Sequence, residues 1–209
     1  MSEPTIFIID DDPSVRKGLT RLVTASGMNV ESFATARDFL DSGDLDSPGC
    51  IILDVQMPGM TGPELQEELG NTSYELPIIF LSAHGDIPTT ANAMKKGAVD
   101  FLTKPVDGPV LLETIGKSLE KDAENRHQRK LNSEINKQLS LLTAREYEVM
   151  TWVITGMLNK QIAGEMEISE ETVKIHRGRV MQKLGIVSVP ELVRLCEQAK
   201  IEPAKKGTL

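Results

Sequence analysis

Carboxylate and ammonium side chains follow short apolar runs at three places in this chain. Asp10, Asp11 and Asp12 come directly after one run, and Asp54 ends a second. Lys104 comes shortly after a third. Such runs are typical of buried parallel strands, and ligands of an open α/β sheet bind where the carboxyl ends of its strands meet. We therefore expect these five side chains to lie together at one edge of a sheet.

The side chains of this cluster are suited to phosphoryl transfer. Clustered carboxylates repel one another unless a cation lies between them. Mg²⁺ prefers oxygen ligands, uses one or two protein carboxylates and also coordinates phosphoryl oxygens. A carboxylate can itself act as the nucleophile and form an aspartyl-phosphate. Because Asp54 stands alone at the end of its run, it is the candidate nucleophile, with Mg²⁺ as the expected cofactor.

Four stretches of the first half resemble the receiver domains of two-component response regulators. They occur in the family's order, at residues 8–12, 53–62, 81–86 and 95–105. The resemblance implies that a sensor histidine kinase transfers a phosphoryl group to Asp54. It also implies a Mg²⁺ site formed by Asp11, Asp54 and the backbone carbonyl of Gln56, with Asp10 acting mainly through a metal-bound water.

The same resemblance implies roles for three further residues. Lys104 would pair with the phosphoryl oxygens, and Ser82 would hydrogen-bond to one of them. In the family, the hydroxyl at the Ser82 position moves toward the phosphate, and the aromatic ring at the Phe101 position turns into the vacated space. Here that ring has no hydroxyl, so the switch would act through packing. The alternative is that Phe101 is an ordinary core residue.

Other classes of phosphate-handling protein fit the sequence less well. Residues 115–118 mimic the end of a phosphate-binding loop, but Leu111 stands where its first glycine must be. A phosphatase of the haloacid-dehalogenase type would need a second aspartate two residues after the nucleophile, where Gln56 stands. Because Gln56 is neither an acid nor a base, we expect the aspartyl-phosphate to persist. Asp12, which precedes Pro13, fits a helix N-cap better than a metal ligand.

The apolar runs of the first half alternate with helical patterns, which predicts a parallel sheet with helices on both faces. We expect an α/β fold, a (βα)5 doubly wound sheet of the flavodoxin-like type. Its strands are predicted at residues 5–9, 28–33, 50–53, 78–81 and 99–102. Gly59 and Gly62 bracket a loop next to Asp54.

The charge of the chain changes sign between its two halves. Residues 1–120 contain 8 basic and 19 acidic side chains, whereas residues 121–209 contain 15 basic and 12 acidic ones, so the net charge of −8 combines −11 with +3. Such an asymmetry points to a module that faces nucleic acid. We expect double-stranded DNA as a partner of the second half.

The second half predicts four helices. The first begins at a capping-box pair, Thr143 and Glu146, with Tyr147, Met150 and Val153 facing inward. Three more are predicted at about residues 159–166, 169–184 and 189–199. A tight turn joins the second helix to the third, which is basic. This is the helix-turn-helix pattern, whose second member enters the major groove of DNA.

This region resembles the LuxR/NarL-type output domains, and with the receiver the chain resembles a FixJ-type response regulator. The matching residues are 142–146, 156, 159–163, 168–169, 171–174, 176 and 183–185. The resemblance implies DNA contacts from Lys174, Ile175, His176 and Arg179, and phosphate contacts from Lys160, Ser169 and Thr172. Two basic residues of the same stretch, Arg177 and Lys183, complete the predicted DNA-binding set.

Two positions of the predicted recognition helix have alternative interpretations. Gly178 lies where this family often has a polar or basic side chain, and a mid-helix glycine costs up to about 1 kcal/mol relative to alanine. It either permits a closer approach to DNA or loses one contact. His176 either contacts DNA or packs within the domain.

We predict a receiver at 1–120, a helical linker at 121–139, an output domain at 140–202 and a disordered tail at 203–209. The linker is polar and lacks Gly and Pro, which favours a continuous helix. No run of 18 apolar residues exists and the amino terminus is acidic, so we expect no membrane span, no signal peptide and a cytoplasmic location. Cys50 and Cys196 fall in different predicted domains and are expected to stay reduced.

The sequence therefore predicts a phosphorylation-activated transcription factor and not an enzyme. Phosphorylation of Asp54 would release the output domain and promote a receiver homodimer through residues 91–104. The pair would bind a two-fold symmetric operator and act on RNA polymerase. One alternative is a phosphoryl relay whose carboxy-terminal helices bind protein, against which the basic stretch argues. Constitutive DNA binding is a second alternative, and the sequence leaves it open.

Overall fold

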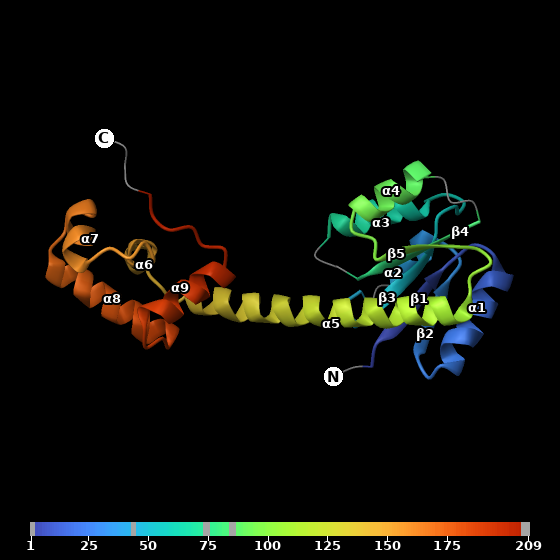
Figure 1. Ribbon diagram of the computed structural model, residues 1–209, viewed down its shortest axis with the longest axis horizontal. Coiled ribbons are helices and arrows are strands. Elements are labelled where there is room, and N and C mark those ends of the chain that lie inside the picture. Colours follow the sequence, from blue (N-terminus) through green and yellow to red (C-terminus); the bar gives the residue numbers. More distant parts are fainter. Residues whose placement is uncertain (1–2, 43–44, 73–75, 84–86, 206–209) are drawn as a thin grey trace. The chain divides into compact units, whose positions relative to one another are not determined.

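The computed structural model describes residues 3–42, 45–72, 76–83 and 87–205 (Figure 1). The chain divides into two compact units, Met1–Arg126 and His127–Leu209. Each unit has its own hydrophobic core. Among the described residues, no helix has the length and apolar character that crossing a bilayer requires.

The first unit is built on a five-stranded parallel sheet (Figure 1). Its strands are β1 (Thr5–Ile9), β2 (Asn29–Phe33), β3 (Gly49–Asp54), β4 (Ile78–Ser82) and β5 (Asp100–Thr103). They lie in the order β2-β1-β3-β4-β5. The winding direction reverses between β1 and β3, and ligands of such sheets bind outside the carboxyl ends at this point. The predicted doubly wound α/β fold is confirmed.

Helices cover both faces of this sheet. They are α1 (Pro13–Ala25), α2 (Ala36–Ser42), α3 (Gly62–Gly70), α4 (Ile87–Lys95) and α5 (Gly108–Leu139). Side chains of α2, α3 and α4 form one core with the sheet, and those of α1 and the start of α5 form the other. Every residue of β3 is buried, which explains why this strand has an uninterrupted apolar run.

Side-chain caps define where the helices after β1 and β3 begin. Asp12 is the N-cap of α1, as predicted, and its Oδ1 accepts a hydrogen bond from the Ser14 N–H at 2.7 Å. Thr61 and Glu64 form a capping box at the start of α3. Between them, Gly62 packs against the end of β3: a Cβ built on it would lie 2.3 Å from the carbonyl oxygen of Asp54.

Helix α5 is continuous from Gly108 to Leu139, so the predicted linker at 121–139 is helical. The first compact unit extends along it to Arg126, beyond the predicted receiver end at residue 120. Asp122 explains this extension. It is only 1% exposed, and its Oδ2 accepts hydrogen bonds from the Gly49 N–H at 3.0 Å and from Arg126 Nε at 2.7 Å.

The second unit contains the end of α5, whose Leu139 packs against its core, and four further helices. These are α6 (Ala144–Val153), α7 (Asn159–Glu165), α8 (Glu170–Leu184) and α9 (Val189–Gln198). Ser169 caps α8, and Gly185 ends it in the left-handed conformation, with φ of 65°. Cys196 is buried here and Cys50 is buried in the first unit, and both thiols are free. Residues 203–205 lack regular structure, and the rest of the predicted tail lies outside the described residues.

The prediction that Tyr147 faces inward is wrong, because this side chain is 39% exposed. The buried face of α6 has the helical spacing of Glu146, Val149, Met150 and Val153. A charged residue thus takes the inward position that an apolar one was expected to fill. Its buried carboxylate is paired with Lys183, as described below.

Candidate functional site

The clustered carboxylates lie where the winding of the sheet reverses. Asp10 directly follows β1 and Asp54 ends β3, and the two strands are paired with Ile9 opposite Leu53. Ligand oxygens of Asp10, Asp11 and Asp54 all lie within 4.8 Å of one another. Asp10 and Asp54 are buried, whereas Asp11 is exposed. The structure thus brings together three of the four predicted metal-binding residues through their side chains.

Lys104 reaches this cluster from the end of β5. Its Nζ lies 2.6 Å from Asp10 Oδ2 and 3.1 Å from Asp54 Oδ1. Burial works to lower the pKa of Lys104, but its hydrogen bonds and charge contacts with the two aspartates outweigh burial and raise that pKa. Burial also raises the pKa of Asp54 above its ordinary value, although Lys104 acts to lower it. Lys104 is therefore a permanent cation within the cluster.

The donor set fits Mg²⁺. All donors are oxygens, and the formal charges of three carboxylates and one ammonium leave two negative charges for a divalent cation to balance. The fourth predicted ligand is the backbone carbonyl of Gln56, and the backbone N–H of the same residue donates a hydrogen bond to the Asp54 carboxylate. Bound Mg²⁺ would neutralise charge on phosphoryl oxygens.

The two predicted switch residues lie on the neighbouring strands β4 and β5. Ser82 is buried at the end of β4, and its carbonyl accepts a hydrogen bond from the Lys104 N–H at 2.7 Å. Phe101 is half-buried, and its ring centroid lies 6.1 Å from that of the fully buried Phe80. Residues 84–86, the end of one matching stretch, lie outside the described residues.

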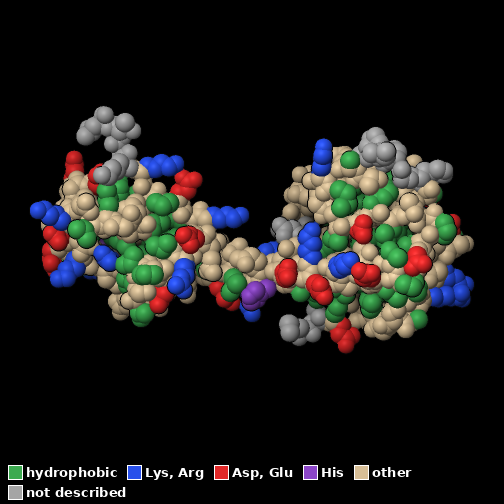
Figure 2. Space-filling model, in the orientation of Figure 1, with side chains coloured by type: hydrophobic (Ala, Val, Ile, Leu, Met, Phe, Trp, Pro, Cys, Tyr) green, Lys and Arg blue, Asp and Glu red, His purple; other side chains and the backbone are tan. Residues whose placement is uncertain are grey.

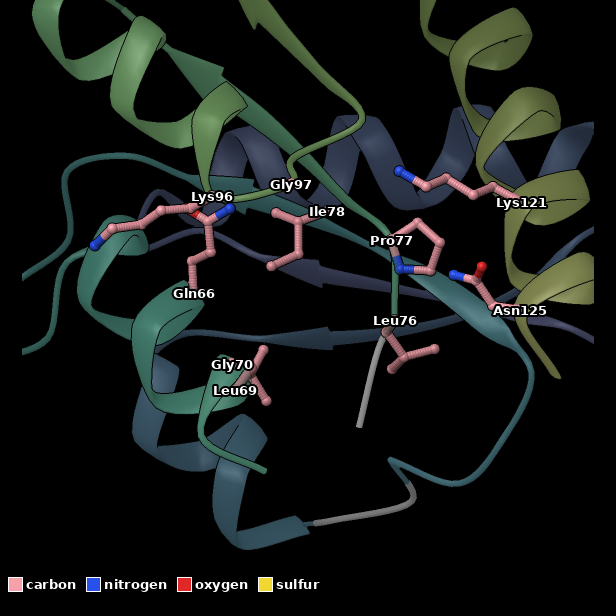
Figure 3. Close-up of a pocket in the computed structure, with 10 residues that line it drawn as sticks. All are labelled: Gln66, Leu69, Gly70, Leu76, Pro77, Ile78, Lys96, Gly97, Lys121 and Asn125. Carbon is pink, nitrogen blue, oxygen red and sulfur yellow. The ribbon is translucent and has the colours of Figure 1, made fainter. Parts of the chain in front are cut away.

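A separate hollow lies at the opposite edge of the sheet (Figure 3). It measures about 210 Å³ and adjoins the amino-terminal end of β4, where Pro77 and Ile78 line it. Lys121 and Asn125 direct polar groups toward it in Figure 3, whereas the amide of Gln66 donates to the Ala93 carbonyl at 3.1 Å. Because Asp54 and Ser82 end their strands at the other edge, this hollow is not part of the acidic cluster.

The predicted DNA-contacting residues differ in how accessible they are. Lys160, Ser169, Lys174, Ile175 and Arg179 are exposed, whereas Thr172, His176 and Arg177 are half-buried. Exposed Ile175 and Gly178 lie one helical turn apart on α8, and nothing lies within 4 Å of a Cβ built on Gly178. Basic and acidic side chains are interspersed on the face of the second unit that Figure 2 shows.

Two of the predicted DNA-contacting residues, Arg177 and Lys183, are bound to residues outside their own helix. Arg177 donates to Asn159 Oδ1 at 2.9 Å and so ties α8 to α7. Lys183 Nζ lies 2.6 Å from Glu146 Oε2 and also donates to the Leu141 carbonyl at 3.0 Å. These contacts hold the domain together, and we leave Lys183 out of the proposed DNA contacts. The capping box identified Glu146 as a helix-capping residue, but neither its burial nor its pairing with Lys183 was foreseen.

The ion pair of Glu146 predicts how acid affects the second unit. The hydrogen bond from Lys183 lowers the pKa of Glu146 from 4.5 to about 2. A carboxylate whose folded pKa is depressed stabilises the fold above its unfolded pKa and loses that contribution as the pH falls through the folded pKa. Urea unfolding of residues 127–209, followed by fluorescence of the single tryptophan, Trp152, should therefore show stability falling between pH 4.5 and about 2. Glu146→Gln should flatten this fall, and an equally steep fall in that variant would contradict the assignment.

Comparisons with known proteins agree with this architecture. Residues 6–116 match the response regulator receiver domain, and residues 140–196 match the luxR family of bacterial regulatory proteins. The transcriptional regulatory protein FixJ of Azorhizobium caulinodans is 39% identical over 203 residues, which cover 97% of this chain and 96% of that protein. Nodulation protein W of Bradyrhizobium diazoefficiens is 41% identical over 192 residues, which cover 92% and 85%.

Two solved structures extend the likeness to both units. The response regulator StyR is 47% identical with a TM-score of 0.79, covering 94% of this chain and 100% of that one. Full-length FixJ from B. japonicum is 36% identical with a TM-score of 0.58, covering 96% and 99%. A receiver fold with a helix-turn-helix output domain defines a response regulator. This chain belongs to the FixJ-type family of two-component response regulators, with a LuxR-family DNA-binding output domain.

Proposed function

We propose that a sensor histidine kinase phosphorylates Asp54 with Mg²⁺ as cofactor, and that phosphorylation promotes receiver dimerisation and operator binding in the cytoplasm. The position of Asp54 carries this proposal. Its carboxylate ends a buried strand, 3.1 Å from Lys104 Nζ and among the oxygens of Asp10 and Asp11. An apolar hollow of about 290 Å³ beside Lys104, lined by side chains of α1 and by Pro105 and Val106, supports docking of a partner protein.

The transfer itself needs little from the protein beyond positioning and charge. A carboxylate oxygen of Asp54 attacks the phosphorus of a phosphohistidine, and the P–N bond breaks as the new O–P bond forms. The imidazole leaves with the electron pair of that bond. Lys104 stays charged throughout and can move from the carboxylates to a phosphoryl oxygen. Gln56 offers no acid or base for hydrolysis, which favours a persistent signal.

The conformational response of the receiver to phosphorylation would involve Ser82 and Phe101. The Ser82 hydroxyl would turn toward the phosphoryl group, and the half-buried Phe101 ring would pack further inward beside Phe80. Reversing a 1:99 equilibrium takes about 5.5 kcal/mol of preference for one state. Two receivers would then pair through residues 91–104. Because the pair holds two output domains together, their combined binding to DNA would be stronger than that of one domain.

A direct test combines intact mass with sedimentation. The purified chain is incubated with Mg²⁺ and a small acyl-phosphate, and each sample is divided between the two measurements. We expect one phosphoryl adduct and a shift from monomer to dimer. An adduct without a change in assembly would favour a relay, and the absence of an adduct would contradict the proposal.

Lys160 tests the DNA-binding surface. This exposed side chain lies at the start of α7, where the family resemblance predicts a phosphate contact. Lys160→Ala should weaken binding similarly for all DNA sequences and reduce the slope of log affinity against log salt by about 1. Lys137→Ala, an exposed lysine on α5, is the matched control and should leave the slope unchanged. Equal slopes for both variants would place the DNA elsewhere.

Constitutive DNA binding is the second candidate, because the second unit has a core of its own. Residues 127–209, the second compact unit, are the fragment to compare with the full chain, since Leu139 at the end of α5 packs against that core. Tighter operator binding by the fragment would support masking by the receiver. Equal affinity for fragment and unphosphorylated chain would support constitutive binding.

A further inference from the structure

The connection between β1 and α1 contains two of the three clustered carboxylates. Hydrogen bonds fix some of its residues through their side chains and another through its backbone. The Asp10 carboxylate accepts hydrogen bonds from the Asp12 N–H at 2.9 Å and from Lys104 Nζ at 2.6 Å. The Asp12 carboxylate caps α1. Both residues are thus fixed through their side chains. Asp11 is the exposed member of the cluster, and it is held through its backbone.

Arg16 holds that backbone. This half-buried residue lies on the first turn of α1, and its Nη1 donates to the carbonyl oxygen of Asp10 at 2.6 Å and to that of Asp11 at 2.9 Å. One nitrogen shared by two successive carbonyls fixes the peptide unit between them. The direction of the Cα–Cβ bond of Asp11 is fixed with it.

We propose that Arg16 is a positioning residue for the Mg²⁺ site, which directs the Asp11 carboxylate toward Asp54 before the cation binds. This inference rests on the proposed function of Asp54. Among the described residues, Arg16 makes no ion pair with a carboxylate within 4.0 Å, whereas Lys104 makes two with this cluster. Arg16 therefore orders the loop, and Lys104 balances the charge.

The two possible roles of Arg16 predict opposite effects on Mg²⁺ affinity. If Arg16 acted only as a charge, its removal would take a cation away from the site and tighten Mg²⁺ binding. If it positions Asp11, its removal leaves two carbonyls without a donor and a carboxylate without a fixed direction. Groups that hydrogen-bond to metal ligands typically change metal affinity by roughly 10–100-fold when they are mutated.

Calorimetric titration of MgCl₂ into the unphosphorylated full chain decides between these roles. Arg16→Ala is expected to bind Mg²⁺ about tenfold more weakly than the unaltered chain. Lys17→Ala removes the same charge from the exposed neighbouring residue and should bind as the unaltered chain does, or slightly more tightly. Arg16→Lys keeps the charge but has a single ammonium in place of the planar guanidinium, and should regain only part of the affinity.

Mg²⁺ affinity of Arg16→Ala that is equal to or tighter than that of the unaltered chain would overturn the inference. Circular dichroism shows whether each variant is folded, and Arg16→Gln gives the same comparison if the alanine variant is not. In parallel, the rate of adduct formation with an acyl-phosphate should reach the same limit in Arg16→Ala but require more Mg²⁺. No adduct in the unaltered chain at saturating Mg²⁺ would refute the proposed function of Asp54, and the calorimetric comparison would still decide the role of Arg16.

Discussion

Asp54→Asn is expected to take up no phosphoryl group from an acyl-phosphate donor at any Mg²⁺ concentration, and to show no donor-dependent change in assembly or operator binding. An amide has no anionic oxygen to attack phosphorus, whereas its size is that of the aspartate it replaces. The effect should therefore be complete loss of the response with the fold retained. Intact mass, sedimentation and gel shift, each with and without the donor, measure the three parts of this prediction.

Asp12→Asn is the matched control for this variant. It makes the same chemical change next to the cluster, but Asp12 caps α1 and its carboxylate lies outside the group of oxygens that could hold the metal. Asparagine is as good an N-cap as aspartate. The control should accept the phosphoryl group as the unaltered chain does. An adduct on Asp54→Asn, or equal loss in both variants, would show that Asp54 is not the acceptor.

Asp122→Ala is expected to destabilise the first unit by about 1–3 kcal/mol, the usual cost of leaving a buried donor without its acceptor. The change leaves the Gly49 N–H without its acceptor and the Arg126 guanidinium without its counter-charge. Hydrogen exchange of the full chain measures the effect, because amides of β3 should lose protection while those of α8 keep theirs.

Glu124→Ala provides the control on the same helix. Its side chain is exposed, and surface substitutions usually change stability by no more than about 0.5 kcal/mol. Asp122→Asn keeps an oxygen that can accept from Gly49 and should fall between the two. If the amides of β3 are equally protected from exchange in Asp122→Ala and in Glu124→Ala, the buried network contributes nothing to the stability of this unit.

The fold of the first unit could be predicted because its signals are local. The strands β1, β3 and β4 each have an apolar run, and a polar residue stands at or directly after the carboxyl end of each of them. The position of Asp10 beside Asp54 then follows from the parallel order of β1 and β3. Helix ends were equally readable, because a cap such as that of Asp12 or Thr143 involves residues only two or three positions apart.

The remaining features depend on contacts between distant segments. Nothing in the spacing of Glu146 and Lys183, or of Asp122 and Gly49, indicates that they meet, since 37 and 73 residues separate the two pairs. The burial of Glu146 displaced Tyr147 to the surface for this reason. The contacts of Arg16, in contrast, are local in sequence. A basic residue in the first turn of a helix that follows an acidic loop can fold back and donate to the carbonyls of that loop.

Gly62 limits which substitutions the evolution of this chain can accept next to Asp54. Exchange of Asp12 for asparagine would preserve the cap of α1, so that position is open to inheritable change. Gly62 has no functional group, yet any side chain there would collide with the carbonyl oxygen of Asp54 and with the ring of Phe80. A lineage that keeps the backbone path of β3 at Asp54 must therefore keep this glycine too. Packing alone restricts position 62, although its residue contributes no chemistry.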